Sequence, residues 1–259
     1  RLDLVPGLTL IRNRQNRGFA AACNQGAAGL VSELILFLKP DTRLFANSLA
    51  APLKLLQQPG HARTGIVGIA MVDDQGRVVP SCARFPRAWH FASHAIGLDR
   101  IWPRTVHFML EWNHADTRRV DQVIGAFFMI RRSVFETLAG FDERFFVYFE
   151  EVDLALRARQ AGWDSVYLAD ASVYHKGGGT SEAVKDLRLF YSLRSRLQFG
   201  RKHYAWPEQL LLWTITFGLE PLTRVLHLGL AGRWAEIRQV AAANVMLWRD
   251  LLLRISDAS

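Results

Sequence analysis

An aromatic run that leads into three acidic residues is the strongest chemical signal in this sequence. Four of the five residues in segment 145–149 are aromatic, and Glu150, Glu151 and Asp153 follow them directly. The aromatic run has neither the alternation of a strand nor the stripe of a helix. An aromatic wall beside adjacent carboxylates suits sugar binding with a general base. Alternatively, the acids complement the positive end of a helix, and Asp153 pairs with Arg157 one turn later.

Two more candidate residues stand at the ends of expected strands. Asp41 follows the apolar run 34–38, at the edge where α/β sheets bind ligands, and a carboxylate there can hold a divalent cation against a diphosphate. The alternative for Asp41 is an ordinary turn and helix cap. His175 precedes the glycine run 177–179 and is either a metal ligand or structural. Those glycines permit close approach to phosphate, but the spacing of a P-loop is absent.

Strands that alternate with helices predict an α/β layered fold that positions these residues. Strands are expected at 8–11, 34–38, 65–72, 78–79, 123–130, 165–168 and 172–175. Helices are expected at 19–30, 44–58, 133–139 and 150–161. Residues 81–119 show no clean period, and we expect them to form a long excursion that covers a cleft.

The last third of the chain has only helical pattern, with Trp206, Trp213, Trp234 and Trp248 set among Leu and Arg. The apolar stretch 210–230 is interrupted by charged residues and a proline, which argues against a spanning helix. Two interpretations stay open: interfacial amphipathic helices at a membrane surface, or a helical subdomain packed on the sheet.

The composition and net charge of the chain are compatible with three classes of binding partner. The 259 residues are half hydrophobic and carry a formal net charge of +8, which is compatible with nucleic acid, an anionic membrane or a phosphate-bearing substrate. Because the sequence has no run of five or more Lys or Arg, a nucleic-acid partner is not expected. The two cysteines, Cys23 and Cys82, have no metal or redox spacing, and we expect buried thiols.

Taken in order, the motifs of residues 8–200 resemble those of the family 2 glycosyltransferases, in the rhamnosyltransferase-like branch. The first motifs are Asn16, Gly18-Phe19-Ala20, Asn24 and Gly26, followed by Pro40-Asp41-Thr42. The most specific block is Gly125-Ala126, Arg131-Arg132, Phe135, Gly140-Phe141-Asp142-Glu143, Phe145-Phe146, Tyr148 to Leu154, Arg157 and Ala161-Gly162-Trp163. The last motif is His175, Gly178 and Ser181.

The resemblance implies a GT-A fold, a Rossmann-like mixed sheet flanked by helices, over residues 1–181. The helical C-terminal region at 182–259, expected from its own pattern, keeps both interpretations given above, membrane association being one of them. The resemblance further implies an inverting transfer of a sugar, rhamnose in this branch, from a nucleotide-diphosphate donor to a glycan or lipid-linked acceptor in bacterial surface polysaccharide synthesis. The expected location is cytoplasmic, peripheral at the inner face of the plasma membrane. A divalent cation, Mg²⁺ or Mn²⁺, is the expected cofactor.

The resemblance also assigns roles to individual residues. Glu151 is the expected base, and Glu150 and Asp153 support the acceptor site and the helix. The expected metal ligands are Asp41 and His175. The expected donor-binding residues are Lys39, Asp41, Asn16, Gly18, Asn24 and Gly125. The expected acceptor-binding residues are Phe146, Tyr148, Phe149 and Trp163.

Two departures from the family pattern qualify these expectations. The chain begins at Arg1, after the point where the family has its first strands, so we expect an N-terminally incomplete donor site. This favours the alternative of a non-catalytic module that binds glycan or membrane, whereas the intact acidic cluster disfavours it. Lys39 stands where the family has Asn or Asp, and a cation there predicts weakened metal dependence.

Overall fold

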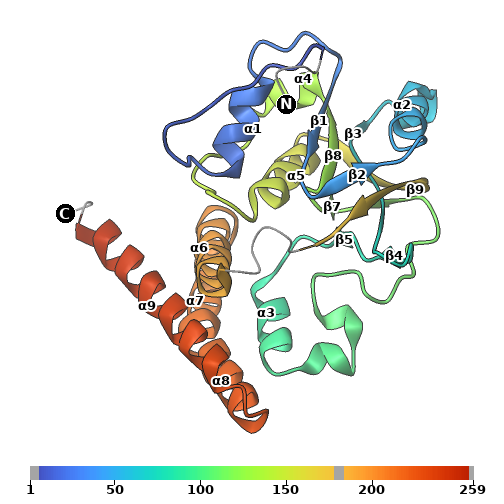
Figure 1. The fold of residues 1–259 in the computed structure, drawn as a ribbon. Helices are drawn as coiled ribbons and strands as arrows, with labels where there is room; N and C mark the ends of the chain where they lie inside the picture. The colour runs from blue at the N-terminus through green and yellow to red at the C-terminus, as the bar shows by residue number, and fades with distance from the viewer. Residues whose placement is uncertain (1–5, 178–183, 257–259) are drawn as a thin grey trace.

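A mixed seven-stranded sheet forms the centre of the computed structural model, which describes residues 6–177 and 184–256 (Figure 1). The main path runs in the order β1 (Leu34–Leu38), β8 (Phe127–Arg131), β3 (Thr64–Val72), β9 (Asp164–His175) and β2 (Thr42–Leu44). Off this path, β4 (Val78–Val79) pairs with β3 and β6 (Arg118–Val120) with β9. Strands β3 and β9 are parallel, and the other pairings are antiparallel. The expected mixed α/β sheet is therefore confirmed.

Both faces of the sheet are covered, which explains why its central strands are almost continuously apolar. In β3, Ile66 and Ala70 point into a core with α1 (Phe19–Ala27), α4 (Arg132–Thr137) and α5 (Glu150–Gln160). The alternate residues Val67, Ile69 and Met71 point into a second core that includes α2 (Ala50–Gln57). The short sheet of β5 (Cys82–Ala83) and β7 (Gln122–Val123) adjoins the first core.

Four expected elements differ in the structure. The strand expected at 123–130 divides into β7 (Gln122–Val123) of the short sheet and β8 of the main sheet. Residues 8–11 are exposed and pair with no described strand. The expected helix 44–58 begins only at Ala50, because Thr42–Leu44 pairs with β9 instead. The two extended segments after Asp164 form one strand, since residues 169–171 bulge out of the register with β3 between Leu168 and Ser172.

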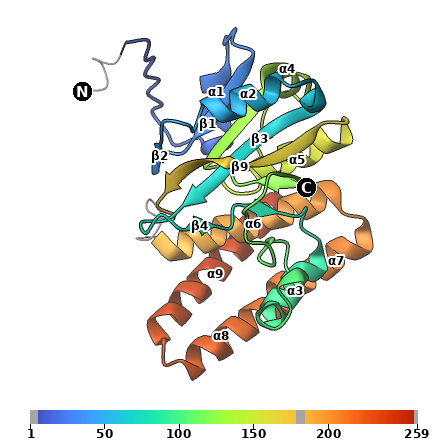
Figure 2. The ribbon, with the colours of Figure 1, turned by 90° about the vertical axis from the view of Figure 1, so that its right-hand side faces the viewer.

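Four helices follow the sheet. They are α6 (Lys185–His203), α7 (Trp206–Thr214), α8 (Glu220–Leu230) and α9 (Trp234–Ser256), with a π-helical segment at Ile215–Leu219. They lie together at one end of the molecule (Figure 2), and a core formed by Phe145, Val152, Phe199 and Leu212 packs α6 and α7 against α5. The structure thus contains a packed helical region, one of the two expected forms.

The excursion 81–119 is part of this packing. Its helix α3 (Ala88–Ala95) buries Ala88 and Phe91 in the core shared with α6 and α7, and short turns follow at Leu98–Arg100 and Pro103–Thr105. No residue of the excursion lines the pocket described below. The expectation that it covers a cleft stays a prediction, whereas its helix α3 helps to join the helical region to the sheet domain.

Gly68 of β3 provides a test of how closely the two sheets approach. A Cβ atom at this position would lie 2.6 Å from Cβ of Val123. We expect Gly68→Ala to lower the free energy of unfolding by about 1–3 kcal/mol through overpacking, measured by urea denaturation. Val123→Ala in the same chain should restore part of the loss. Gly60→Ala, whose Cβ meets nothing within 4 Å, is the control; equal effects at both glycines would contradict the packing.

Candidate functional site

A pocket of about 660 Å³ lies between the start of α1, the loop after β1, the segment before α5, and α6. Its lining residues are Asn16, Gly18, Phe19, Lys39, Pro40, Asp41, Phe146, Val147, Tyr148, His175, Gly177, Val184, Leu187, Arg188 and Tyr191. Seven of the residues predicted to bind donor, acceptor or metal are therefore brought together: Asn16, Gly18, Lys39, Asp41, Phe146, Tyr148 and His175.

Gly18 fixes one wall of this pocket through a close approach of two backbone segments. The Phe19 amide donates to the Phe146 carbonyl over 2.7 Å, and a Cβ on Gly18 would lie only 2.3 Å from that carbonyl oxygen. Gly18 also has a φ of +88°, which glycine adopts without strain. The Asn16 side chain accepts a hydrogen bond from the Gly18 amide at 3.0 Å. These residues hold the start of α1 against the aromatic segment.

Asp41 and His175 face each other at the end of the sheet. The pairing of β2 with β9 places Thr42 opposite His175, and Asp41 Oδ1 lies 3.5 Å from His175 Nε2. Burial lowers the pKa of His175, the carboxylate of Asp41 opposes that shift, and the charge of Lys39 adds to it. A neutral imidazole beside a carboxylate is a donor set that fits a divalent cation.

The pair supplies only two of the ligands that such a cation needs. Within residues 6–177 and 184–256, no group of three or more His, Cys, Asp or Glu side chains has the arrangement of a metal site. Mg²⁺ is usually bound through one or two protein side chains together with substrate phosphates and water. Asp41 and His175 fit that kind of shared site.

Lys39 extends the same wall toward α5. Its amide donates to the Ala126 carbonyl at 3.0 Å, and its Nζ lies 5.8 Å from the centre of the Phe19 ring. Its charge favours the ionised form of Glu150 and disfavours the protonated form of His175. Lys39 is therefore the cation that acts on both the metal pair and the acidic cluster.

The acidic cluster begins directly after two residues with left-handed backbone, Tyr148 and Phe149, whose φ values are +68° and +69°. Such strain in residues other than glycine is retained where surrounding contacts impose it, often at functional sites. Glu150 is buried, and its burial together with the nearby charge of Glu151 raises the pKa of Glu150 well above its usual range. Burial thus favours the neutral form of Glu150, whereas the side chain of Glu151 is partly exposed.

Glu151 lies beside the pocket and not in its lining. A Cβ on Gly125 would come within 3.4 Å of Glu151 Oε1, so the missing side chain of Gly125 leaves space at the carboxylate. Oε2 of Glu151 has no hydrogen-bond partner in the described part of the chain. Gly125 borders this carboxylate, and the next residue, Ala126, accepts the hydrogen bond of the Lys39 amide, so Glu151 lies close to the Lys39 wall of the pocket.

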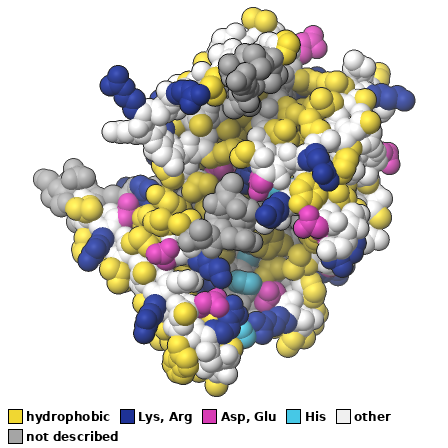
Figure 3. Space-filling view, in the orientation of Figure 1, with side chains coloured by type: hydrophobic (Ala, Val, Ile, Leu, Met, Phe, Trp, Pro, Cys, Tyr) yellow, Lys and Arg dark blue, Asp and Glu magenta, His cyan; other side chains and the backbone are white. Residues whose placement is uncertain are grey.

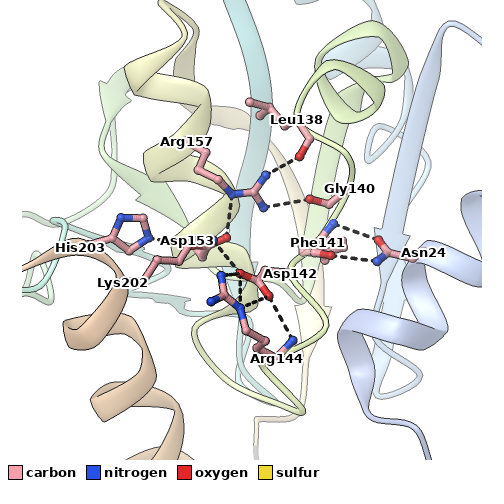
Figure 4. Close-up of polar contacts among 10 residues, drawn as sticks. All are labelled: Asn24, Leu138, Gly140, Phe141, Asp142, Arg144, Asp153, Arg157, Lys202 and His203. Carbon is pink, nitrogen blue, oxygen red and sulfur yellow. Dashed lines mark hydrogen bonds and ion pairs between the residues drawn. The ribbon is translucent and has the colours of Figure 1, made fainter.

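Asp153 differs from the two glutamates because its charge is fully compensated (Figure 4). It is completely buried, and its oxygens lie 2.7 Å from Arg157 Nε, 2.6 Å from Lys202 Nζ and 2.7 Å from His203 Nε2. Burial alone would raise the pKa of Asp153, but these partners lower it overall. The structure gives Asp153 a positioning role, in agreement with the predicted pairing to Arg157, and not contact with substrate.

Asn24, predicted to bind donor, instead clasps a loop. Its amide donates to the Phe141 carbonyl at 2.8 Å, and its Oδ1 accepts from the Phe141 amide at 2.9 Å (Figure 4). Arg157 holds the same loop through the carbonyls of Leu138 and Gly140. Because both polar groups of Asn24 are used by the backbone, the donor contact is corrected to a structural one.

Two of the predicted acceptor residues are also elsewhere. The Phe149 ring packs 5.4 Å from the ring of Phe199, in the core under α6. Trp163 packs against the first core beside Gly65, just before the start of β9, whereas His175 ends that strand. Neither residue lines the pocket. Both aromatic rings pack against hydrophobic cores. The sequence alone does not distinguish an aromatic residue of a core from one that binds sugar.

The sequence reasoning missed the contribution of α6 to the pocket. Leu187, Arg188 and Tyr191 line it, and the Tyr191 ring stacks on that of Phe146 at a centroid distance of 4.8 Å. Their i, i+1, i+4 spacing was a signal for one helical face, but no pattern indicated what that face meets. Gly178 and Ser181 of the last predicted motif lie outside the described residues.

Comparisons with known proteins agree with this geometry. Residues 34–255 match the model of glycosyl transferase family group 2. Over 225 residues the chain is 29% identical to N-acetylglucosaminyl-diphospho-decaprenol L-rhamnosyltransferase of Mycobacterium tuberculosis, covering 81% of this chain and 72% of that protein. Over 163 residues it is 29% identical to rhamnosyltransferase WbbL of Escherichia coli K12, covering 62% of this chain and 56% of that protein.

One solved structure supports the fold. The mannosyltransferase PcManGT from Pyrobaculum calidifontis, solved with GDP-Man and Mn²⁺, has a TM-score of 0.53 and 17% identity, covering 93% of this chain and 70% of that one. The family match spans most of the chain, including both the sheet and the C-terminal helices. The chain therefore belongs to glycosyl transferase family group 2, and it is a glycosyltransferase of the rhamnosyltransferase-like kind.

Proposed function

We propose that this glycosyltransferase moves a sugar, rhamnose, from a nucleoside-diphosphate donor to a sugar that is carried on a lipid-linked diphosphate. The observation that supports this most is the common neighbourhood of Asp41, His175 and Lys39 with Glu151. Asp41, His175 and Lys39 can bind a diphosphate, directly or through a cation. The Glu151 carboxylate can accept the proton of an acceptor hydroxyl. The relative of M. tuberculosis is named for a lipid-linked diphosphate acceptor.

The proposed reaction is a single displacement with inversion at the anomeric carbon. Glu151 accepts the proton of the acceptor hydroxyl, and the oxygen of that hydroxyl forms the new bond to the anomeric carbon. The bond from that carbon to the diphosphate oxygen breaks, and the nucleoside diphosphate leaves with the electron pair. Burial and the nearby charge of Glu151 raise the pKa of Glu150, so we assign the role of base to Glu151 and not to Glu150.

Asp41 and His175 are the residues that we propose to hold a divalent cation, Mg²⁺ or Mn²⁺. When bound, such a cation neutralises charge that develops on a departing diphosphate. Lys39 supplies a fixed positive charge in the same wall of the pocket, and it repels a nearby cation while attracting phosphate. We therefore propose a dependence on metal that is weaker than in relatives with an uncharged residue at this position.

Replacing the two glutamates separately tests the assignment of the base. We expect Glu151→Gln to reduce turnover by about 10²–10⁴, the usual contribution of a general base, with donor binding retained. Glu150→Gln should keep most of the turnover, since burial already favours the neutral form of Glu150. Initial rates and donor affinity are the measurements. Near-normal turnover of Glu151→Gln, or a larger loss in Glu150→Gln, would show that the assignment is wrong.

The Glu150 variant also has a predicted effect on stability. A carboxyl whose pKa is raised on folding stabilises the fold below its unfolded pKa, and this contribution is lost as the pH rises through the folded value. Glu150→Gln removes this loss of stability at high pH, because the amide of Gln does not ionise. Its melting temperature should therefore exceed that of the native protein by more at pH 9 than at pH 6. A constant difference across this range would argue against a buried, protonated Glu150.

Substitution of Lys39 tests the weakened metal dependence. We expect the native protein to keep measurable turnover when Mg²⁺ or Mn²⁺ is withdrawn, and Lys39→Asn to lose turnover more completely, because it lacks the fixed cation at the diphosphate. Turnover is measured against metal concentration for both. Lys54→Asn, which removes a lysine from α2 outside the pocket, is the control. Identical metal curves for native protein and Lys39→Asn would exclude this role.

The helical region offers a surface for the membrane part of the proposal. Leu222, Leu226 and Leu230 recur every fourth residue along α8, and all three are more than 60% exposed. Hydrophobic side chains gather at the lower end of the face in Figure 3. Among the described residues, no helix is long and apolar enough to cross a membrane. We propose that residues 182–259 hold the protein at an anionic membrane surface.

Flotation with anionic liposomes tests this surface. Changing Leu222, Leu226 and Leu230 together to Gln should lower the membrane-bound fraction about tenfold or more, because burial of each leucine contributes on the order of 1 kcal/mol. The control changes three exposed apolar residues outside the C-terminal helices to Gln, and it should leave the membrane-bound fraction unchanged. These residues are Ile96, Ile101 and Val31. If the native protein stays in the soluble fraction both with and without lipid, the proposed attachment to the membrane is wrong.

A further inference from the structure

A second cavity, of about 470 Å³, lies between α6, α8 and α9. It is lined by Lys185, Arg188, Leu189, Ser192, Arg224, His227, Leu228, Arg233, Glu236, Gln239 and Val240. None of these residues belongs to the acidic cluster or to the metal pair. The cavity is therefore a feature of the helical region that the proposed chemistry does not explain.

The lining of this cavity carries an excess of positive charge. It has four Lys or Arg side chains and one carboxylate, Glu236. Arg233 is paired with Glu236 at 2.6 Å, and Arg224 with Glu220 at 2.7 Å. Within residues 6–177 and 184–256, neither Lys185 nor Arg188 makes an ion pair within 4 Å. The charge of Lys185 acts on Glu236 without forming a close ion pair, so the side chains of Lys185 and Arg188 both keep donors for an anion, and phosphate oxygens are strong acceptors for such donors.

Arg188 joins this cavity to the first pocket, because it lines both. The two neighbours of Arg188 on α6 each line one cavity only: Leu187 lines the first pocket, and Leu189 lines the second cavity. An elongated ligand could therefore occupy both spaces while remaining in contact with one side chain. A sugar attached to a diphosphate has that shape and places its charge at one end.

The apolar face of α8 lies on the opposite side of the helix from the cavity. Arg224, His227 and Leu228 line the cavity, whereas the exposed Leu222 and Leu226 are offset from Arg224 by roughly half a turn at 3.6 residues per turn. Lys, Arg and His side chains also gather above the apolar lower end of the face in Figure 3. The basic cavity and the surface proposed to meet the membrane thus lie on opposite sides of α8.

We propose that this basic cavity binds the diphosphate of the lipid-linked acceptor, and so positions the acceptor sugar in the first pocket. The inference rests on the proposed function for the identity of the ligand. Lys185 and Arg188 contact the phosphate oxygens, Arg233 contributes when it turns from Glu236, and the lipid continues toward the membrane. The nucleoside diphosphate of the donor is held separately, at Asp41, His175 and Lys39.

Binding of farnesyl diphosphate, a short polyprenyl diphosphate, tests the assignment without the need for turnover. Isothermal titration calorimetry compares the native protein with Lys185→Gln and with the double variant Lys185→Gln/Arg233→Gln. We expect the Kd to rise about tenfold in the first and further in the second, since charge-assisted phosphate contacts are lost. Lys185→Arg should restore most of the affinity. Arg238→Gln, which removes an exposed arginine of α9 outside the cavity, should have no effect.

Two further titrations distinguish other sources of phosphate. Titration of dTDP with Mg²⁺ reports the donor site, and we expect its Kd to change less than twofold in Lys185→Gln. Titration with phosphatidylglycerol vesicles reports a general headgroup site, and we expect a smaller loss there than for farnesyl diphosphate. Circular dichroism and the melting temperature verify that each variant is folded.

The results that would overturn the proposal are distinct from those that would overturn the function. Equal affinity of native protein and Lys185→Gln for farnesyl diphosphate, an equal loss for dTDP, or an equal loss for vesicles would each exclude an acceptor diphosphate site. Saturable binding of farnesyl diphosphate that depends on Lys185 supports the cavity, even if the native protein transfers no sugar. In that event only the proposed reaction would fail.

Discussion

The buried charge of Asp153 is the interaction on which the geometry of this site depends. A fully buried carboxylate is costly unless it is paired, and its partners come from two elements: Arg157 of α5, and Lys202 and His203 of α6. The pairing ties the sheet domain to the helical region. Arg157 also holds the loop at Gly140. The start of α5, with its glutamates, is thereby fixed between α1 and α6.

This arrangement explains why the two neighbouring glutamates behave differently. Glu150 is buried in the protein, where burial and the charge of Glu151 raise its pKa. Glu151 faces the space left open by Gly125. The left-handed backbone of Tyr148 and Phe149 sets this orientation. Glu150 is therefore part of the packed interior, whereas Glu151 is the glutamate that we propose as the general base.

Sequence patterns predicted the sheet and most of the site, because they report on burial and on strand ends. The apolar run at 65–72 identified a central strand and the run at 34–38 an edge strand. Asp41 follows β1 and His175 ends β9, and the two side chains lie together. The patterns failed where residue type does not determine contacts. Asn24 has the chemistry of a ligand-binding residue but clasps the Phe141 backbone. Trp163 has the chemistry of a sugar platform but packs in the core.

The role of α6 was beyond sequence reasoning for a related reason. Its helical face is visible in the spacing of Leu187 and Tyr191, but only the tertiary structure brings that face to Phe146. The same helix borders a second, basic cavity through Arg188. The helical region is thus part of the binding surface as well as the proposed attachment to the membrane.

The stereochemistry of transfer tests the central claim most directly. The native protein is incubated with dTDP-rhamnose, Mg²⁺ and a synthetic N-acetylglucosaminyl-diphosphate lipid, and the anomeric configuration of the product is determined by NMR. We predict a transferred sugar whose configuration is inverted relative to the donor, as a single displacement requires. A product with retained configuration would contradict the proposed mechanism, because retention requires a second displacement that Glu151 acting as a base does not provide.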